Sequence, residues 1–361
     1  TFGQQAAAAV EKARHQVAEL IACEPAEIVW TSGASESDNL ALKGVAEAYA
    51  GRGRHLVTAA TEHRAVLDVC SRLEQRGFEV TYLAVEPDGR VDPQAVRAAL
   101  RDDTVLVSLM LANNEIGVLH PLREISEICR QRGVLVHTDA AQALAWEDCR
   151  VDELGVDLMS ISGHKVYGPK GVGALYVRRR RPRVRLVPRI DGGGHEKGRR
   201  SGTLNVPGIV GLGKACELIL EQRRDDAVRV AELRDLLLER LRAELPGLSV
   251  NGCLRHRLPN NLNVALPGIS AERLVGELSS VALSAGAACS DPGQGGSYVL
   301  RALAGHEVAE TSLRIGLGRT TRRADIEHAA TAIVRAASKL SEMPEAVQTE
   351  LACDLPCAIA G

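Results

Sequence analysis

Short apolar runs alternate with longer amphipathic stretches between about residues 27 and 177, and this alternation leaves few folds open. We expect strands at 27–31, 55–60, 78–85, 104–109, 134–138, 157–160 and 173–177. Apolar residues recur at helical spacing between them, and helices are expected at 38–49, 65–76, 91–100 and 121–132. This alternation predicts an α/β fold in which helices cover a mostly parallel sheet.

A second region begins with a long helical stretch at 207–245, where apolar residues such as Leu233 and Leu237 recur at helical spacing. Beyond it we expect strands at 261–265, 281–284 and 312–315 and helices at 271–278, 298–304 and 323–340. The sequence therefore predicts two domains, a large one at 1–222 and a small α+β domain at 223–361.

The two ends of the chain carry weaker signals. The first residue is Thr1 and a helical pattern follows at once, so we expect that an opening segment is missing. The tail after Met343 shows no period, and we expect it to be loose.

Composition argues against several classes of protein. Lys and Arg total 44 against 46 for Asp and Glu, so the chain lacks the basic excess of proteins that bind nucleic acid or membrane surfaces. No apolar stretch reaches the roughly 18 residues that a transmembrane helix needs. The nine cysteines are widely spaced without a C-x-x-C pair, which favours reduced thiols in a cytoplasm over a zinc site or disulfides.

An arginine-rich run stands out at 178–185. It can be read as a solvated connector between two elements. It can also be read as a docking patch for an acidic partner or a nucleic acid. The sequence leaves both interpretations open.

Two candidate catalytic residues follow expected strands. Lys165 comes just after the strand at 157–160, where a desolvated lysine can react with a carbonyl, although on its own such a lysine more often contacts a phosphate or lies on the surface. Asp139 ends the strand at 134–138 and is either a helix cap or a functional anion. Both residues can reach the same edge of a parallel sheet. Pyridoxal 5'-phosphate (PLP) requires this pair of residues, an aspartate that contacts its pyridine nitrogen and a lysine that reacts with its aldehyde.

The phosphate of such a cofactor needs its own binding site. Residues 31–37, small and rich in hydroxyls, lie between a strand and a helix, where backbone N–H groups and the helix dipole favour an anion. A simple capped turn would use the same residues. Neither a Walker A motif nor a G-x-G-x-x-G motif after a strand is present, which argues against an NTPase and a dinucleotide enzyme.

Taken together, several segments resemble the PLP-dependent cysteine desulfurases of the class V aminotransferase group. They are 31–39, 61–63, 113–118, 139–142, 162–171, 200–203, 284–289 and 312–314, and they agree in order from about residue 2 to 340. The resemblance implies PLP fold type I, with a large domain built on a mixed, mostly parallel sheet and a smaller α+β domain. It also implies conversion of L-cysteine into L-alanine with transfer of the sulfur.

The resemblance further implies roles for individual residues. Lys165 would hold the cofactor, His63 would stack on its ring and move protons, and Cys289 would be the nucleophile that carries sulfur as a persulfide. Asn114 and Arg314 would bind the substrate carboxylate, and the resemblance implies no metal. The other cofactor contacts would be Asp139 at the ring nitrogen, Gln142 and Asn114 at the ring hydroxyl, Ala34, Ser35, Ser162 and His164 at the phosphate, and Thr203 from a partner subunit.

The residues around Cys289 fit this role on their own. Small residues and glycines at 284–296 predict a mobile, exposed loop that could carry a thiol to a partner. A buried, inert thiol suits Cys23, Cys70, Cys129 and Cys216 better. Asp291 would raise the pKa of the Cys289 thiol, so we expect the thiolate to form in a complex.

The loop after Cys289 is long, like that of the relatives that deliver sulfur for iron–sulfur cluster assembly. The expected partners are a second copy of the chain, L-cysteine and a sulfur-acceptor protein. Iron–sulfur assembly, tRNA thiolation and DNA phosphorothioation all remain open as pathways.

The sequence also departs from the family pattern. The usual opening strand is absent, and Ser35 stands where threonine is common. A selenocysteine lyase or a class V aminotransferase of the same fold remains an alternative. So does a non-catalytic sulfur-relay protein.

Overall fold

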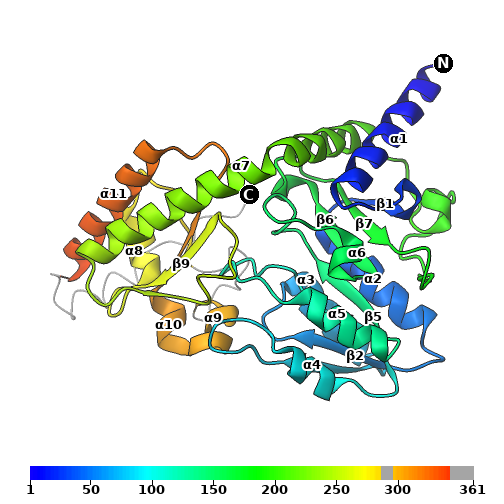
Figure 1. Cartoon of the computed structure of the whole chain (residues 1–361), viewed down its shortest axis with the longest axis horizontal. Helices are drawn as coiled ribbons and strands as arrows, with labels where there is room; N and C mark the ends of the chain where they lie inside the picture. The colour runs from blue at the N-terminus through cyan, green and yellow to red at the C-terminus, as the bar shows by residue number, and fades with distance from the viewer. Residues whose placement is uncertain (286–295, 342–361) are drawn as a thin grey trace. The chain divides into compact units, whose positions relative to one another are not determined.

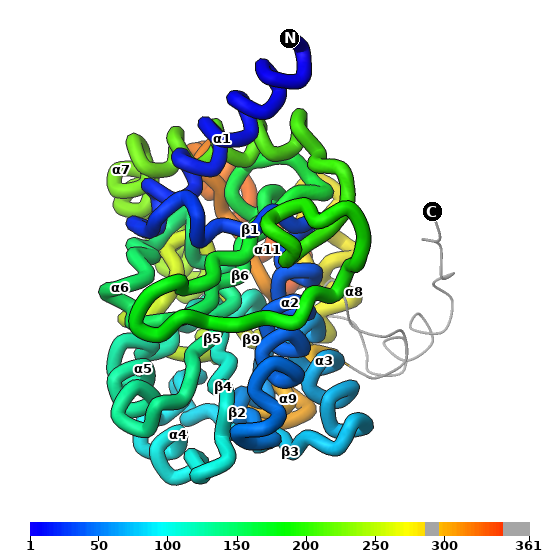
Figure 2. The backbone as a smooth tube through the Cα atoms, turned by 90° about the vertical axis from the view of Figure 1, so that its right-hand side faces the viewer, coloured from blue at the N-terminus to red at the C-terminus, as the bar shows by residue number. Residues whose placement is uncertain are grey.

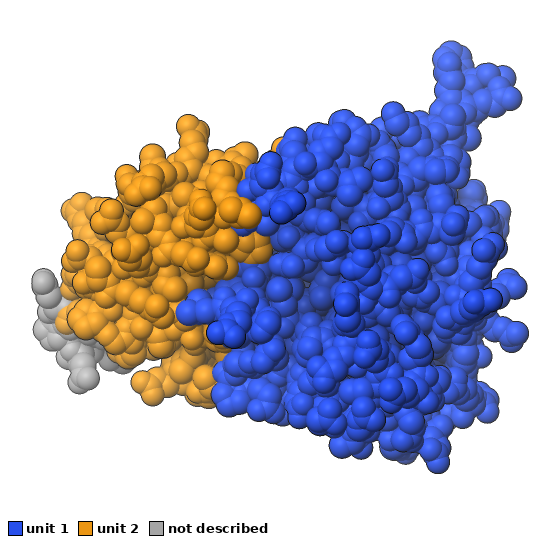
Figure 3. Space-filling view, in the orientation of Figure 1, with its two compact units in different colours: residues 1–227, 253–258 blue, residues 228–252, 259–361 orange. Residues whose placement is uncertain are grey.

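The computed structural model describes residues 1–285 and 296–341 (Figure 1). The chain divides into two compact units, one of residues 1–227 with 253–258 and the other of residues 228–252 with the residues from 259 onward (Figure 3). Both this division and the expected boundary at 222/223 fall inside the long helix α7 (Val206–Glu244). Among the helices of the described residues, none is long and apolar enough to cross a membrane.

The first unit is built on a seven-stranded sheet with the order β1-β7-β6-β5-β4-β2-β3. Its strands are β1 (Ile28–Thr31), β2 (His55–Ala59), β3 (Glu79–Leu83), β4 (Thr104–Ser108), β5 (Leu135–Asp139), β6 (Leu158–Ser162) and β7 (Gly173–Val177). Neighbouring strands from β3 to β6 pair in parallel, as the alternation predicts. Strand β7 is antiparallel to both β6 and β1, because the connection at 163–172 is shorter than the dozen or so residues that a parallel crossover needs.

The helices of this unit are α1 (Phe2–Leu20), α2 (Ala34–Ala48), α3 (Arg64–Glu74), α4 (Pro93–Ala99), α5 (Leu122–Gln131) and α6 (Val151–Leu154). Helix α2 begins at Ala34 and not near residue 38, since the small polar residues before 38 form its first turn. It packs across β1 and the central strands β4, β5, β6 and β7. Its apolar side joins a core of aliphatic side chains, among them Leu40, Val45 and Leu106.

The second unit contains a three-stranded antiparallel sheet in the order β10-β9-β8. Its elements are β8 (Ser249–Val250), β9 (Asn261–Ala265), α8 (Ala271–Glu277), α9 (Tyr298–Ala304), α10 (His306–Thr311), β10 (Ser312–Gly316) and α11 (Arg323–Ser341). The expected strand at 281–284 is wrong. Only Ser284 pairs there, as an isolated bridge to Arg314, while the short strand β8 takes the third place in the sheet.

Two backbones approach closely where β1, β7 and α2 meet. A Cβ atom at Gly173 would collide with the carbonyl oxygen of Ile161 and lie 2.6 Å from Cα of Gly33. Gly33 itself has φ of 155°, a conformation that favours glycine, and it immediately precedes α2. The start of α2 can therefore reach the sheet edge only because both positions lack a side chain.

We expect Gly173→Ala to lower the free energy of unfolding by about 1–3 kcal/mol, since the added methyl group must displace backbone atoms. Gly316→Ala is the matched control, because Gly316 is also a strand glycine but has open space around it. Its effect should stay within about 0.5 kcal/mol. Urea unfolding of the two variants measures the difference, and equal effects would contradict the proposed close contact.

Candidate active site

The sheet topology gathers the candidate residues at one edge of the first unit. Strands β1, β2, β4, β5 and β6 all run in the same direction, so their carboxyl ends share this edge with the start of the antiparallel β7. The residues that follow these ends are His63 after β2, Asn114 after β4, Asp139 and Gln142 at β5, and Ser162, His164 and Lys165 at β6. The prediction that Asp139 and Lys165 lie at the same edge is confirmed.

Lys165 lies in a tight 3-10 turn, Gly163–Lys165, that follows β6 directly. The Ser162 hydroxyl and Nδ1 of His164 are 3.0 Å apart and form a hydrogen bond. Burial lowers the pKa of His164, and the charges of Lys165 and Lys170 lower it further, which favours a neutral imidazole. The Lys165 side chain is exposed in the single chain, so it is not desolvated as the sequence suggested.

Asp139 ends β5 and is 7% exposed. Its Oδ1 accepts a hydrogen bond of 2.8 Å from the backbone N–H of Ala141, so it caps a turn and not a helix. Burial raises the pKa of Asp139, while the Ala141 N–H and the positive charges of His63 and Lys165 oppose that rise without cancelling it. A buried carboxylate whose cost is only partly offset would be stabilised by one more cationic group, such as a protonated pyridine nitrogen.

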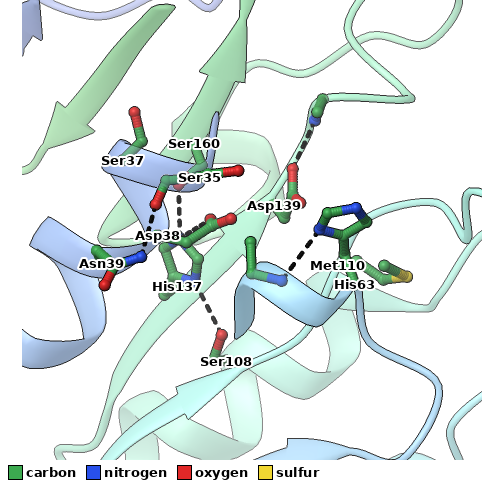
Figure 4. A network of polar contacts seen from close by, with 12 residues as sticks. Ser35, Ser37, Asp38, Asn39, His63, Ser108, Met110, His137, Asp139 and Ser160 are labelled. Atoms are coloured by element: carbon green, nitrogen blue, oxygen red, sulfur yellow. Dashed lines mark hydrogen bonds and ion pairs between the residues drawn. The ribbon is translucent and has the colours of Figure 1, made fainter. Parts of the chain in front are cut away.

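His63 caps helix α3 with its side chain. Its Nδ1 accepts a hydrogen bond of 3.1 Å from the N–H of Ala65, which leaves the proton of a neutral ring on Nε2. Figure 4 shows this imidazole beside Asp139 at the sheet edge. The capping contact thus fixes the orientation of the His63 ring, which the sequence alone did not reveal.

Asn113 is a residue whose role the sequence analysis missed. Its amide nitrogen donates to the carbonyl of Thr61 at 2.9 Å, and its Oδ1 accepts from the N–H groups of Glu115 and Ile116. These bonds tie the loop that presents Asn114 to the segment that leads into His63. The sequence shows two adjacent asparagines, Asn113 and Asn114, but it does not reveal which of them holds the loop and which faces the site.

The first turn of α2 has the features of an anion site. Gly33 provides no side-chain cap for its N–H groups, and helix N-termini favour negative charge. Register across the sheet pairs Ser162 with Gly173 and Gly173 with Thr31, so Ser162 lies two strands from the start of α2. Ala34 and the exposed Ser35 lie in this turn.

The segment with Thr203 is anchored to the same turn. Nε of Arg200 lies 2.8 Å from Oε1 of Glu36, whose other oxygen accepts from the N–H of Ser32. Burial acts to raise the pKa of Glu36, but the hydrogen bonds from Arg200 and Ser32 outweigh it and lower the pKa. Thr203 itself is exposed in the single chain.

The arginine-rich run follows β7 and passes along helix α2, as the green segment of Figure 2 shows. Arg178 pairs with Asp152 at 2.7 Å and with Asp157 at 3.2 Å, so it is structural. Two residues past the run, the N–H of Val187 donates to the carbonyl of Gly44 and holds the segment to α2. The other arginines at 180, 181, 183 and 185 are exposed, and both interpretations of the run stay open.

The remaining predicted residues belong to the second unit. Arg314 lies in β10, and its backbone N–H donates to the carbonyl of Ser284 at 2.9 Å. Cys289 lies outside the described residues.

The buried cysteines of the first unit are poor nucleophiles. Cys70, Cys129 and Cys216 are buried, as predicted, and burial raises the pKa of each thiol to about 12. Cys149 is buried too. Cys23 is half-buried and not fully buried, a correction to the sequence-based expectation; it lies three residues past the end of α1 at Leu20.

We predict that Glu36→Gln destabilises the protein at neutral pH by about 1–3 kcal/mol, the usual loss when a charged group loses its partner. Because the pKa of Glu36 is lowered in the folded protein, ionised Glu36 stabilises the fold at any pH above the ordinary glutamate pKa of about 4.5. That stabilisation is lost as the pH falls below this value. Urea unfolding at neutral and acid pH should therefore show a difference from wild type that shrinks on acidification. Glu124→Gln, at an exposed site on α5, should show none, and a pH-independent loss in Glu36→Gln would contradict the account.

Comparison with known proteins agrees with this geometry. Residues 1–328 match the family described as Aminotransferase class-V. Cysteine desulfurase IscS of Anaeromyxobacter sp. (strain Fw109-5) is 54% identical over 343 residues, which cover 95% of this chain and 85% of that protein. Cysteine desulfurase IscS of Pseudomonas aeruginosa (strain UCBPP-PA14) is 51% identical over 346 residues, with coverage of 95% and 84%.

Solved structures give the same result. A NifS-like protein superposes with a TM-score of 0.87 at 35% identity and covers 94% of this chain and 90% of its own. DndA from Streptomyces lividans superposes with a TM-score of 0.76 at 39% identity, with coverage of 87% and 89%. The likeness confirms the predicted PLP fold type I. The chain therefore belongs to the class-V aminotransferase family and, within it, to the PLP-dependent cysteine desulfurases.

Proposed function

We propose that the chain converts L-cysteine into L-alanine with Lys165, His63 and Asp139 at its centre, and passes the sulfur through Cys289 to an acceptor protein. One observation carries the proposal. Asp139 is a buried carboxylate at a strand end on which the charges of both Lys165 and His63 act. Such a group suits a protonated pyridine nitrogen between a lysine and an imidazole.

The chain's residues fit PLP from its ring to its phosphate. Lys165 would hold the aldehyde carbon, Asp139 the ring nitrogen, and Gln142 and Asn114 the ring hydroxyl. The uncapped N–H groups of α2 near Ala34, with Ser35, Ser162 and His164, would hold the phosphate. When bound, PLP supplies an electron sink for bond cleavage next to the substrate's α-carbon.

The side chains then divide the proton chemistry. Released from the cofactor, the Lys165 amino group can take a proton from the α-carbon and return one later. His63 presents its Nε2 side to the site, because Nδ1 is engaged by the N–H of Ala65. Arg314 would bind the substrate carboxylate through a bidentate ion pair, and Asn114 would add a hydrogen bond.

Cys289 would perform the sulfur transfer. Its thiolate forms an S–S bond to the substrate sulfur while the C–S bond breaks and leaves its electron pair on carbon. Protonation of that carbon gives alanine, and a persulfide stays on Cys289. Cys289 follows Ser284 by five residues in the sequence, and the backbone of Ser284 is hydrogen-bonded to that of Arg314.

We further propose a homodimer, in which the exposed Thr203 of one subunit reaches the phosphate of the other. The six described cysteines are free thiols, in keeping with a cytoplasmic enzyme. The sulfur acceptor would be a separate protein, of the kind that receives sulfur for iron–sulfur clusters.

Lys165→Ala should abolish the visible absorbance of the bound cofactor and reduce alanine formation to background, because Lys165 is the only described lysine in a turn that directly follows a strand at this edge. Lys170→Ala is the matched control, since Lys170 is an exposed lysine in the same connection. It should keep both signals. Normal turnover in Lys165→Ala would mean that a different residue holds the cofactor.

Cys289→Ser should still bind PLP and L-cysteine with an unchanged melting temperature, but it should form neither persulfide nor alanine above background. Serine is nearly isosteric, yet its hydroxyl is a poor nucleophile toward sulfur near neutral pH. Cys253→Ser, at a half-buried thiol of the first unit, should behave like wild type in an assay for alanine and protein-bound sulfur. Wild-type alanine formation in Cys289→Ser would favour a lyase, and a requirement for a keto acid would favour an aminotransferase.

A further inference from the structure

Three carboxyl groups are buried together behind the candidate site. Asp38 lies on α2, Glu62 follows β2, and Asp139 ends β5; Figure 4 shows the first and last of these around His137. Asp38 and Glu62 have no exposed surface, whereas Asp139 keeps 7%. Three carboxylates cannot all ionise in a low-dielectric interior, so the fold must select which of them carries charge.

The surroundings favour Asp139 as the ionised group. Of the three, only Asp139 has nearby groups that can be cationic, Lys165 and the protonated form of His63, and together with the Ala141 N–H they oppose the rise in its pKa that burial causes. Burial raises the pKa of Asp38 well above its usual range, and repulsion from Asp139, and from Glu62 in its ionised form, raises it further. Burial likewise raises the pKa of Glu62, and one N–H, that of Met110, opposes it.

His137 connects Asp38 to the strand of Asp139. Its Nε2 lies 3.6 Å from Oδ1 of Asp38 and 3.0 Å from the Ser160 hydroxyl, and its Nδ1 lies 2.8 Å from the Ser108 hydroxyl. Burial lowers the pKa of His137 to about 3, so the ring is neutral and the contact with Asp38 is not an ion pair. Neither oxygen of the buried Asp38 carboxyl group has a hydrogen-bond partner among the described residues, so an ionised Asp38 would be uncompensated and the neutral acid is favoured.

Geometry links this pair to the site. Residues two apart on a strand face the same side, so His137 and Asp139 both face the side of the sheet that α2 covers. Asp139 pairs in register with Ser160, whose hydroxyl also contacts His137 and lowers the pKa of Asp38. Movement of His137 or Asp38 would therefore shift the end of β5 that carries Asp139.

We propose that Asp38 and Glu62 are kept as neutral carboxylic acids, and that Asp38 and His137 position Asp139 as the single carboxylate that faces the cofactor's ring nitrogen. This inference rests on the proposed function, which assigns Asp139 to that nitrogen. Asp38 and His137 act through Asp139, so they are positioning residues and not catalytic ones.

The test uses the holoenzyme loaded with PLP that carries ¹⁵N in its ring, because the ¹⁵N chemical shift reports whether that nitrogen is protonated. Wild type should give the protonated signal, and Asp139→Asn the unprotonated one. Asp38→Ala and His137→Asn should shift the signal toward the unprotonated value. They should also lower kcat by about 10–100-fold with little change in KM, the range for residues that orient a ligand's direct partner.

The Asp38→Asn variant tests whether Asp38 acts as a neutral carboxylic acid or as a charged carboxylate. The amide is isosteric and uncharged, so it should keep the wild-type ¹⁵N signal that Asp38→Ala loses. A shift in Asp38→Asn as large as in Asp38→Ala would show that Asp38 acts as a charged group, and would overturn the proposal. If Asp38→Ala fails to fold, His137→Asn provides the shifted signal for the comparison, and a shift of that size in Asp38→Asn would overturn the proposal.

Ser37→Ala is the matched control for a purely structural loss. Ser37 neighbours Asp38 on α2 and is equally buried, but its hydroxyl bonds to Thr31 and to the carbonyl of Ala174, away from His137. It should lower the melting temperature without moving the ¹⁵N signal, and an equal shift there would contradict a specific role for Asp38. If Asp139→Asn leaves the signal unchanged, the assignment of Asp139 in the proposed function fails instead.

Discussion

An ionised carboxylate inside a protein is expensive unless nearby groups offset its charge, and Asp139 is where this chain meets that constraint. The offset comes from separate segments: a cap N–H from Ala141, an imidazole after β2 and a lysine after β6. These segments converge only because their strands share one direction. The shared direction of the strands is therefore what allows Asp139 to carry a charge.

The antiparallel strand β7 completes the site. Its first residue, Gly173, brings β6 and β1 together at the edge where Ser162 and the start of α2 lie. A side chain at Gly173 would push Gly33 and the uncapped turn of α2 away. The position suited to a phosphate, at the start of α2, therefore depends on close backbone packing. The position suited to the cofactor ring, at Asp139, depends on charge compensation.

Sequence periodicity predicted most of the large sheet, and strand ends predicted where Lys165 and Asp139 lie. The periodicity was misleading at 281–284, because a run of three apolar residues and a serine cannot reveal whether a neighbouring strand has a free edge to pair with. Sequence periodicity also did not identify Asp38 or His137. A single acid in a helix or a single histidine in a strand gives no periodic signal, and only three-dimensional packing shows that the two meet. The family resemblance named Asn114 and Arg314, but the anchors that hold them, Asn113 and Ser284, came from hydrogen bonds.

The central claim is that Lys165 holds PLP at the edge that Asp139 defines. Borohydride reduction of the holoenzyme fixes the cofactor to its lysine, and mass spectrometry of the digested protein then locates the added mass. The account predicts a single modified peptide that carries the pyridoxyl group on Lys165. Modification at Lys170, or at a lysine of the second unit, would contradict it.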